Sequence, residues 1–209
     1  MNDHFKQKVT EINNDPEQLR AYNSTDSTVV IAGPGSGKTT VLTLKVMRLL
    51  DNVIAEPRGL ACLTYSTESA REFKTRLSKL GLRGRTNVFL GTVHSFCLAE
   101  ILTPFAKLYP KYEIPNPIKI ISEKEKKKLF DSVNPPGGTS ITEMDKERTR
   151  NIRGISRVAL ESYEVALKVA ISFEEALLKS GFIDFISMVK FSVELIQNES
   201  FVRKAIEAK

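Results

Sequence analysis

Apolar residues in the first hundred positions form short runs, and each run is followed by a stretch with helical spacing. The runs have the length and the aliphatic content of buried strands, and they cover Thr28–Ala32, Leu60–Thr64 and Val88–Leu90. The helical stretches begin at Lys38, near Ala70 and at His94. Strand–helix pairs in this order predict a parallel sheet with crossover helices, which is an α/β three-layer core.

Two more helices are expected ahead of the first run, one over residues 4–12 and one from Pro16. Asp15 is the predicted N-cap of the second helix, with Pro16 at its first position and Gln18 at the capping-box position. The helix from Lys38 to about Leu50 is apolar on more than one face, so we expect it to be largely buried against the sheet.

The pattern changes near residue 104, where the first of four closely spaced prolines breaks the chain. A short strand over Ile118–Ile121 is expected next, and then a lysine-rich helix that Ser122 caps. Residues 134–138 read as a loop. From about Ile141 onward the sequence predicts mostly helix, with Gly154 and Gly181 as interruptions or C-caps.

The composition is that of an ordinary globular protein, with 209 residues, 41% hydrophobic and 27% charged. The net charge of +6 is compatible with a polyanionic partner. Cys62 and Cys97 have no metal-ligand spacing, and both are expected to be small buried hydrophobes in a reducing compartment. No signal peptide and no bilayer-length apolar stretch is visible, so a cytoplasmic protein without a membrane partner is expected.

Residues 32–39 form the clearest functional motif in the sequence. They read Ala-Gly-Pro-Gly-Ser-Gly-Lys-Thr between an apolar run and a helix, which is the setting of a phosphate-binding loop. The glycines allow backbone N–H groups to point at a phosphate, and the helix adds its positive dipole end. Lys38 is expected to reach the β- and γ-phosphates, and the Thr39 hydroxyl to ligate Mg²⁺. A merely flexible glycine-rich turn does not explain Lys38 and Thr39 at the start of the helix.

Two clusters of polar and aromatic residues, Leu63–Ala70 and Gly91–Cys97, begin where the second and third predicted strands end. The carboxyl ends of parallel strands share one edge of a sheet, so both clusters are expected beside the phosphate loop. Their hydroxyl and imidazole groups can bind phosphates, and Tyr65 or Phe96 can stack on unpaired bases.

The motifs together resemble those of the UvrD/Rep-type superfamily 1 DNA helicases. Pro16–Gln18 is similar to the adenine-reading Q motif of that family, with Gln18 as the reader, and the family's phosphate loop also begins with Ala, as Ala32 does here. Thr64–Thr67 resembles motif Ia, although Thr67 and Glu68 stand where the family usually has Asn and Lys. Gly91–Phe96 resembles a third motif on the DNA face.

A last segment, Gly181–Phe185, resembles the Gly-x-x-Asp-Phe stretch that precedes the family's Asp-Glu motif. Here Ile186–Met188 replaces the usual Asp-Asp-Leu continuation. The resemblance implies a RecA-like P-loop NTPase core over residues 1–103, a mostly helical basic insertion over 104–175, and a helical return over 176–209.

The resemblance also implies cofactors, partners and site residues. The cofactors are ATP and Mg²⁺, and the partners are single-stranded DNA or a single-strand/duplex junction and the remainder of the helicase polypeptide. Lys38 and Thr39 are the catalytic residues, and Thr39 is the metal ligand. Nucleotide-binding residues are Gln18, Ala32, Gly33, Pro34, Gly35, Ser36, Gly37, Lys38, Thr39 and Thr40. DNA-binding residues are Thr64, Tyr65, Ser66, Thr92, His94, Ser95 and Phe96.

Several of these residues also have a purely structural interpretation. Gln18 can serve only the cap of its helix, Tyr65 can pack at a strand end, and His94 can bond a helix terminus. Asp184 is expected to cap a helix. The lysines of 124–128 fit a solvated face better than a DNA contact. Better candidates for phosphate contacts are Lys146, Arg148, Arg150, Arg153 and Arg157.

Hydrolysis of ATP in this fold needs an acidic residue at the end of an apolar strand and an arginine for the transition state. The sequence has no apolar run that ends in Asp-Glu, and in Ile120–Glu123, the nearest approach, Ser122 takes the Asp position. The resemblance therefore implies an incomplete core that binds ATP without turning it over. The alternative is a self-contained, nucleotide-dependent DNA-binding regulator. A small-molecule kinase leaves the two polar clusters unexplained.

Overall fold

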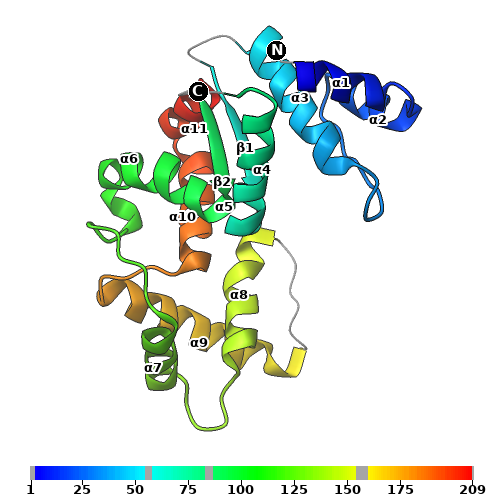
Figure 1. Ribbon diagram of the computed structural model, residues 1–209. Helices are drawn as coiled ribbons and strands as arrows, with labels where there is room; N and C mark the ends of the chain where they lie inside the picture. The colour runs from blue at the N-terminus through cyan, green and yellow to red at the C-terminus, as the bar shows by residue number, and fades with distance from the viewer. Residues whose placement is uncertain (1–2, 55–57, 83–86, 154–159, 209) are drawn as a thin grey trace. The chain divides into compact units, whose positions relative to one another are not determined.

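The computed structural model describes residues 3–54, 58–82, 87–153 and 160–208 (Figure 1). The chain divides into two compact units, of which the first runs to Val93 and the second covers His94–Glu207. The sequence-based boundaries at residues 103 and 175 stay a prediction.

The first unit contains the four helices that the sequence predicts. They are α1 (Asp3–Ile12), α2 (Pro16–Asn23), α3 (Lys38–Asn52) and α4 (Thr67–Lys79). The Asp15 carboxylate caps α2, accepting hydrogen bonds from the backbone N–H groups of Glu17 (3.0 Å) and Gln18 (3.1 Å). The Ser66 hydroxyl caps α4 in the same way.

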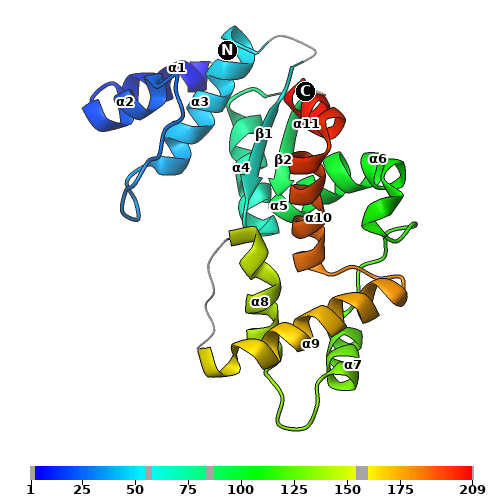
Figure 2. The ribbon, with the colours of Figure 1, turned by 180° about the vertical axis from the view of Figure 1, so that it is seen from behind.

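Two of the three predicted strands form a small parallel sheet. β1 (Leu60–Thr64) pairs with β2 (Val88–Thr92), with Leu60 opposite Val88 and Thr64 opposite Thr92. The two arrows lie side by side in both views, and α4 packs on the strands (Figures 1 and 2). The parallel direction confirms the crossover arrangement expected for this segment.

The prediction of a strand over Thr28–Ala32 is wrong for this structure. The segment has no ladder partner among the described residues, and the side chains of Val29 and Ile31 are 86% and 93% exposed. A β-branched run fits a pleated surface, but it becomes a strand only where neighbouring backbone accepts and donates hydrogen bonds. A P-loop NTPase core is consistent with these elements, and the sheet within the described residues consists of the β1–β2 pair.

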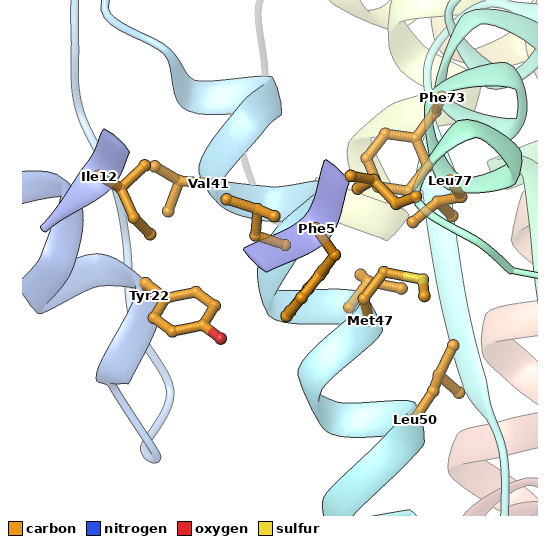
Figure 3. Packing of buried hydrophobic residues seen from close by; sticks show 11 residues of the cluster. Phe5, Ile12, Tyr22, Val41, Met47, Leu50, Phe73 and Leu77 are labelled. Atoms are coloured by element: carbon orange, nitrogen blue, oxygen red, sulfur yellow. The ribbon is translucent and has the colours of Figure 1, made fainter. Parts of the chain in front are cut away.

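The core of the first unit is built mainly from its helices (Figure 3). Figure 3 labels residues from all four of them, with Phe5 of α1, Tyr22 of α2 and Phe73 of α4 gathered around the buried face of α3. Strand residues such as Cys62 and Leu90 pack against this cluster and are only partly buried. Helix α3 is therefore buried as expected, but against helices as much as against the sheet.

The second unit is almost entirely helical, as predicted. The helix expected over His94 to Leu102 is present as α5 (Val93–Phe96) and the π-helical turn η1 (Cys97–Leu102), followed by α6 (Thr103–Phe105). Two 3₁₀ turns, η2 (Ala106–Leu108) and η3 (Pro110–Tyr112), occupy the proline-rich stretch. The remaining helices are α7 (Glu123–Val133), α8 (Ile141–Arg153), α9 (Leu160–Lys179), α10 (Phe185–Asn198) and α11 (Ser200–Glu207).

Predicted helix ends in this unit match the structure where they are described. Ser122 and Glu125 form a complete capping box on α7. Gly181 has a φ of +78° just after α9, and the Phe182 N–H donates to the Leu177 carbonyl (3.2 Å), which closes the helix. Gly154 lies outside the described residues. None of the described helices is long and apolar enough to cross a membrane.

The strand expected over Ile118–Ile121 shrinks to a single parallel bridge between Ile120 and Ile183. The Ile121 N–H donates to the Ile183 carbonyl (2.9 Å), and the Ile183 N–H donates to the Lys119 carbonyl (2.8 Å). Pro117 cannot donate to a ladder, and α7 starts just past Ser122, so little backbone is available for a longer pairing.

Candidate nucleotide and DNA site

The backbone of the loop before α3 has the conformation that phosphate binding requires. Gly35 and Gly37 have φ values of +78° and +79°, and Gly37 stands at the N-terminus of α3 with no side-chain cap bonded there. A Cβ placed on Gly33 or Gly35 would meet no atom within 4 Å, so the space beside both glycines is open. The amides at the start of a helix bind anions, and this loop leaves them uncovered.

The side chain of Lys38 lies across its own loop. Its Nζ donates to the carbonyls of Ala32 and Gly33, at 2.6 Å each, and is 3.4 Å from the Ser36 hydroxyl. The ammonium is thus held over the glycine-rich turn, and it is exposed, as is Thr39. The Thr43 hydroxyl donates to the backbone carbonyl of Thr39 (3.0 Å). This bond does not use the Thr39 hydroxyl, which is the group proposed to face Mg²⁺.

Gln18 reaches the phosphate loop from α2. Its Nε2 donates to the Ser36 carbonyl (3.3 Å), and a Cβ on Gly37 would come within 3.1 Å of the same nitrogen. The expected cap at Asp15 uses the Gln18 backbone, so the Gln18 side chain is available for the loop. This contact over eighteen positions is a detail that sequence reasoning did not supply.

Four of the residues predicted to bind DNA lie at the carboxyl ends of β1 and β2 in the first unit. The Thr64 hydroxyl donates to the Ser66 carbonyl (2.9 Å) and lies 3.5 Å from the Gly91 carbonyl. Thr92 stands opposite Thr64 in the sheet. Between Thr64 and Ser66, the ring of Tyr65 is 88% exposed, so core packing does not account for it.

The other three, His94, Ser95 and Phe96, belong to the second unit. The His94 imidazole makes an edge contact with the Phe185 ring, at 5.0 Å between ring centroids. This contact connects the Gly91–Phe96 motif with the Gly181–Phe185 segment, which sequence reasoning treated separately. Within the described residues, no group of three His, Cys, Asp or Glu side chains could hold a metal ion.

The basic residues suggested for phosphate contacts differ in how exposed they are and in whether an acidic partner holds them. Arg148 is buried and bonded to the Asp184 carboxylate, so the suggestion that it contacts DNA is wrong for this structure. It turns inward because its hydrogen bonds and the three nearby carboxylates of Asp145, Glu174 and Asp184 offset the cost of removing it from water. Lys126, expected on a solvated helix face, is instead buried, because its ammonium pairs with Asp145 and Asp184. Lys146 is exposed and Arg150 half-buried, while Arg153 and Arg157 have no described side chain.

Residues 14–209 match the family described as the UvrD/REP helicase N-terminal domain, and the chain belongs to that family. ATP-dependent DNA helicase SRS2 of Saccharomyces cerevisiae is 34% identical over 136 residues, which cover 63% of this chain and 11% of the relative. A probable DNA helicase II homolog of Mycoplasma capricolum is 28% identical over 132 residues, or 63% of this chain and 18% of the relative.

ATP-dependent DNA helicase PcrA of Staphylococcus aureus is 37% identical over 83 residues, which cover 39% of this chain and 11% of the relative. The chain thus spans less than a fifth of the length of these relatives.

Proposed function

We propose that this chain is the N-terminal part of an ATP-dependent DNA helicase or translocase and that it binds ATP with Mg²⁺. The observation that carries the proposal is the loop Ala32–Thr40, with left-handed glycines at the mouth of α3 and Lys38 folded over it. Its relatives include proteins named ATP-dependent DNA helicases.

In this proposal each part of the loop has a role. The backbone N–H groups between Gly33 and Thr40, Pro34 excepted, and the dipole of α3 receive the phosphates. The Lys38 ammonium exchanges the carbonyls of Ala32 and Gly33 for the β- and γ-phosphates, and the Thr39 hydroxyl faces Mg²⁺. Gln18, already in contact with Ser36, reads the base. The bound metal would neutralise charge on the phosphates.

Single-stranded DNA, or its junction with duplex, is the proposed second ligand. Tyr65 supplies an exposed ring on which a base can stack, and Thr64, Ser66 and Thr92 also lie at the carboxyl ends of the two strands. His94, Ser95 and Phe96 would add contacts from the second unit. The remainder of the helicase polypeptide is the proposed protein partner, and the proposed location is the cytoplasm.

Nucleotide binding is tested by titrating the chain with a fluorescent ATP analogue in the presence of Mg²⁺. Removing the Lys38 charge should weaken binding about tenfold or more, because charge-assisted contacts with phosphate are the strongest in such a loop. Lys74→Ala, at an exposed lysine of α4, is the matched control. Equal affinities for Lys38→Ala and Lys74→Ala would exclude the proposed site.

Turnover is a separate measurement. We propose that the 209-residue chain alone binds ATP without hydrolysing it, because its sequence holds no apolar run ending in Asp-Glu. Steady-state phosphate release that single-stranded DNA stimulates and Lys38→Ala abolishes would contradict this.

DNA binding is tested by fluorescence anisotropy with a labelled single-stranded oligonucleotide. Tyr65→Ala should weaken binding by about tenfold, since stacking on one base contributes roughly 1–3 kcal/mol. Tyr65→Phe keeps the ring and should bind as the parent chain does. If the two variants bind alike, Tyr65 is not a stacking platform.

A further inference from the structure

Helix α2 is attached to the α3 segment at both of its ends. At its N-terminal end the Gln18 Nε2 donates to the Ser36 carbonyl, just ahead of α3. At its C-terminal end, residues 21–24 contact Lys45 and Arg48, which lie two to three turns into α3.

Lys45 binds the C-terminal end of α2. Its Nζ donates to the Ala21 carbonyl (3.1 Å) and to the Ser24 hydroxyl. The last carbonyls of a helix are unpaired within the helix and carry its negative dipole end, so an ammonium is a favourable partner there. Burial of the amine, and secondarily the charge of Arg48, lowers the pKa of Lys45 below its ordinary value.

Arg48 holds the same end of α2 through different groups. Its guanidinium carbon lies 4.6 Å from the centre of the Tyr22 ring, and its Nη1 donates to the Asn23 Oδ1 (3.1 Å). Lys45 and Arg48 are three positions apart and share one face of α3. Together they hydrogen-bond to Ala21, Asn23 and Ser24 and contact the ring of Tyr22.

A helix as short as α2 needs such anchors to keep a fixed position. It has eight residues, and isolated helices of this length are not stable in water. Its apolar anchors are Tyr22, which is buried, and Leu19, which is partly buried. Apolar contacts of this kind allow a helix to slide or rotate on its neighbour. Directional hydrogen bonds at the helix end restrict both movements.

We propose that Lys45 and Arg48 are positioning residues that fix the C-terminal end of α2 and thereby hold Gln18 against the phosphate loop. Within the described residues their hydrogen bonds and ring contact are with Ala21–Ser24 and not with the phosphate loop, so they are expected to act on base selectivity and to leave triphosphate affinity nearly unchanged. The inference rests on the proposed function, in which Gln18 reads the base.

The test compares the affinities of Mg·ATP, Mg·GTP and Mg·tripolyphosphate for the parent chain and its variants. Lys45→Met and Arg48→Met should lower the preference for ATP over GTP about three- to tenfold, which corresponds to one well-placed hydrogen bond. Binding of tripolyphosphate should stay within about twofold of the parent. Lys45→Arg should restore the preference, and Lys74→Met, on α4, is the control.

A second measurement follows α2 directly, by hydrogen exchange of the peptide that contains residues 16–23. Lys45→Met should speed exchange there while α4 exchanges as in the parent chain, and the milder Arg48→Lys should show the same direction. Unchanged exchange in α2 would overturn the positioning role, as would an unchanged ATP preference when Gln18→Ala lowers it. If Gln18→Ala leaves the preference intact, adenine reading itself fails, and the exchange result alone decides whether Lys45 and Arg48 hold α2.

Discussion

The Arg148 guanidinium and the Asp184 carboxylate form a bidentate ion pair in the interior of the second unit. Nη1 donates to Oδ2 at 2.6 Å and Nη2 to Oδ1 at 2.7 Å, with the arginine side chain wholly removed from solvent. The same carboxylate caps α10 through the Ser187 N–H (2.9 Å) and lies 3.1 Å from the Lys126 ammonium. One side chain thus joins α7, α8 and α10.

Removal of this carboxylate should destabilise the second unit strongly. Asp184→Ala leaves Arg148 buried without its main counter-charge, which typically costs about 3–5 kcal/mol in the free energy of unfolding. Urea titration followed by circular dichroism measures the loss. Asp131→Ala, at an exposed position of α7, is the matched control and should change stability by less than about 0.5 kcal/mol. Similar midpoints for the two variants would show that the ion pair contributes little.

Acid should weaken the same unit through Asp184. Burial would raise the pKa of this carboxyl, but the hydrogen bonds and charge of Arg148 outweigh burial and hold the pKa well below the ordinary value of 3.8. A carboxyl with a lowered pKa in the folded state stabilises the fold fully above its unfolded pKa. We therefore expect the difference in stability between the parent chain and Asp184→Asn to shrink as the pH falls below about 4. A difference that stays constant down to about pH 2.5 would be inconsistent with this linkage.

Gly35 and Gly33 allow the backbone conformation of the phosphate loop to be tested with one variant and a matched control. A Cβ at either position meets open space, but only Gly35 has a positive φ, of +78°. Gly35→Ala should lower the stability of the first unit by about 1–2 kcal/mol, because an L-residue resists the left-handed conformation. Gly33→Ala should be close to neutral. Thermal unfolding of the two variants without nucleotide makes the comparison, and equal melting temperatures would contradict it.

The two thiols should be unreactive in the folded chain. Burial raises the pKa of Cys62 to about 11. Burial also raises the pKa of Cys97, a shift that a hydrogen bond with Ser192 partly offsets. Since the thiolate is the reactive form, a disulfide reagent at about pH 8 should label both slowly, and quickly once urea unfolds the chain. Fast labelling of either thiol without denaturant would show that its surroundings open readily.

Local signals in the sequence were sufficient to predict the helices and most of their ends. Asp15 and Pro16 mark the start of α2, Ser122 marks that of α7, and Gly181 ends α9, because caps depend on a few neighbouring residues. The phosphate loop was predictable for the same reason. Its residues are contiguous, and glycine is required at positions with positive φ.

Features that depend on distant partners could not be predicted. Arg148 and Asp184 are 36 positions apart, so the sequence showed a basic series where the structure has a buried ion pair. The β-branched run Thr28–Ala32 has strand propensity, yet a strand needs a neighbouring strand, and propensity does not reveal whether one is present. The contacts of Gln18 with Ser36 and of Lys45 with Ala21 likewise depend on how α2 docks on α3.

The exposed run before the phosphate loop also has a consequence for handling the protein. Val29 and Ile31 present apolar surface on backbone that has no ladder partner among the described residues, and exposed apolar surface beside unpaired backbone favours association between molecules. Concentrated solutions of the chain are therefore expected to self-associate through Thr28–Ala32, so nucleotide and DNA titrations belong at micromolar protein or below.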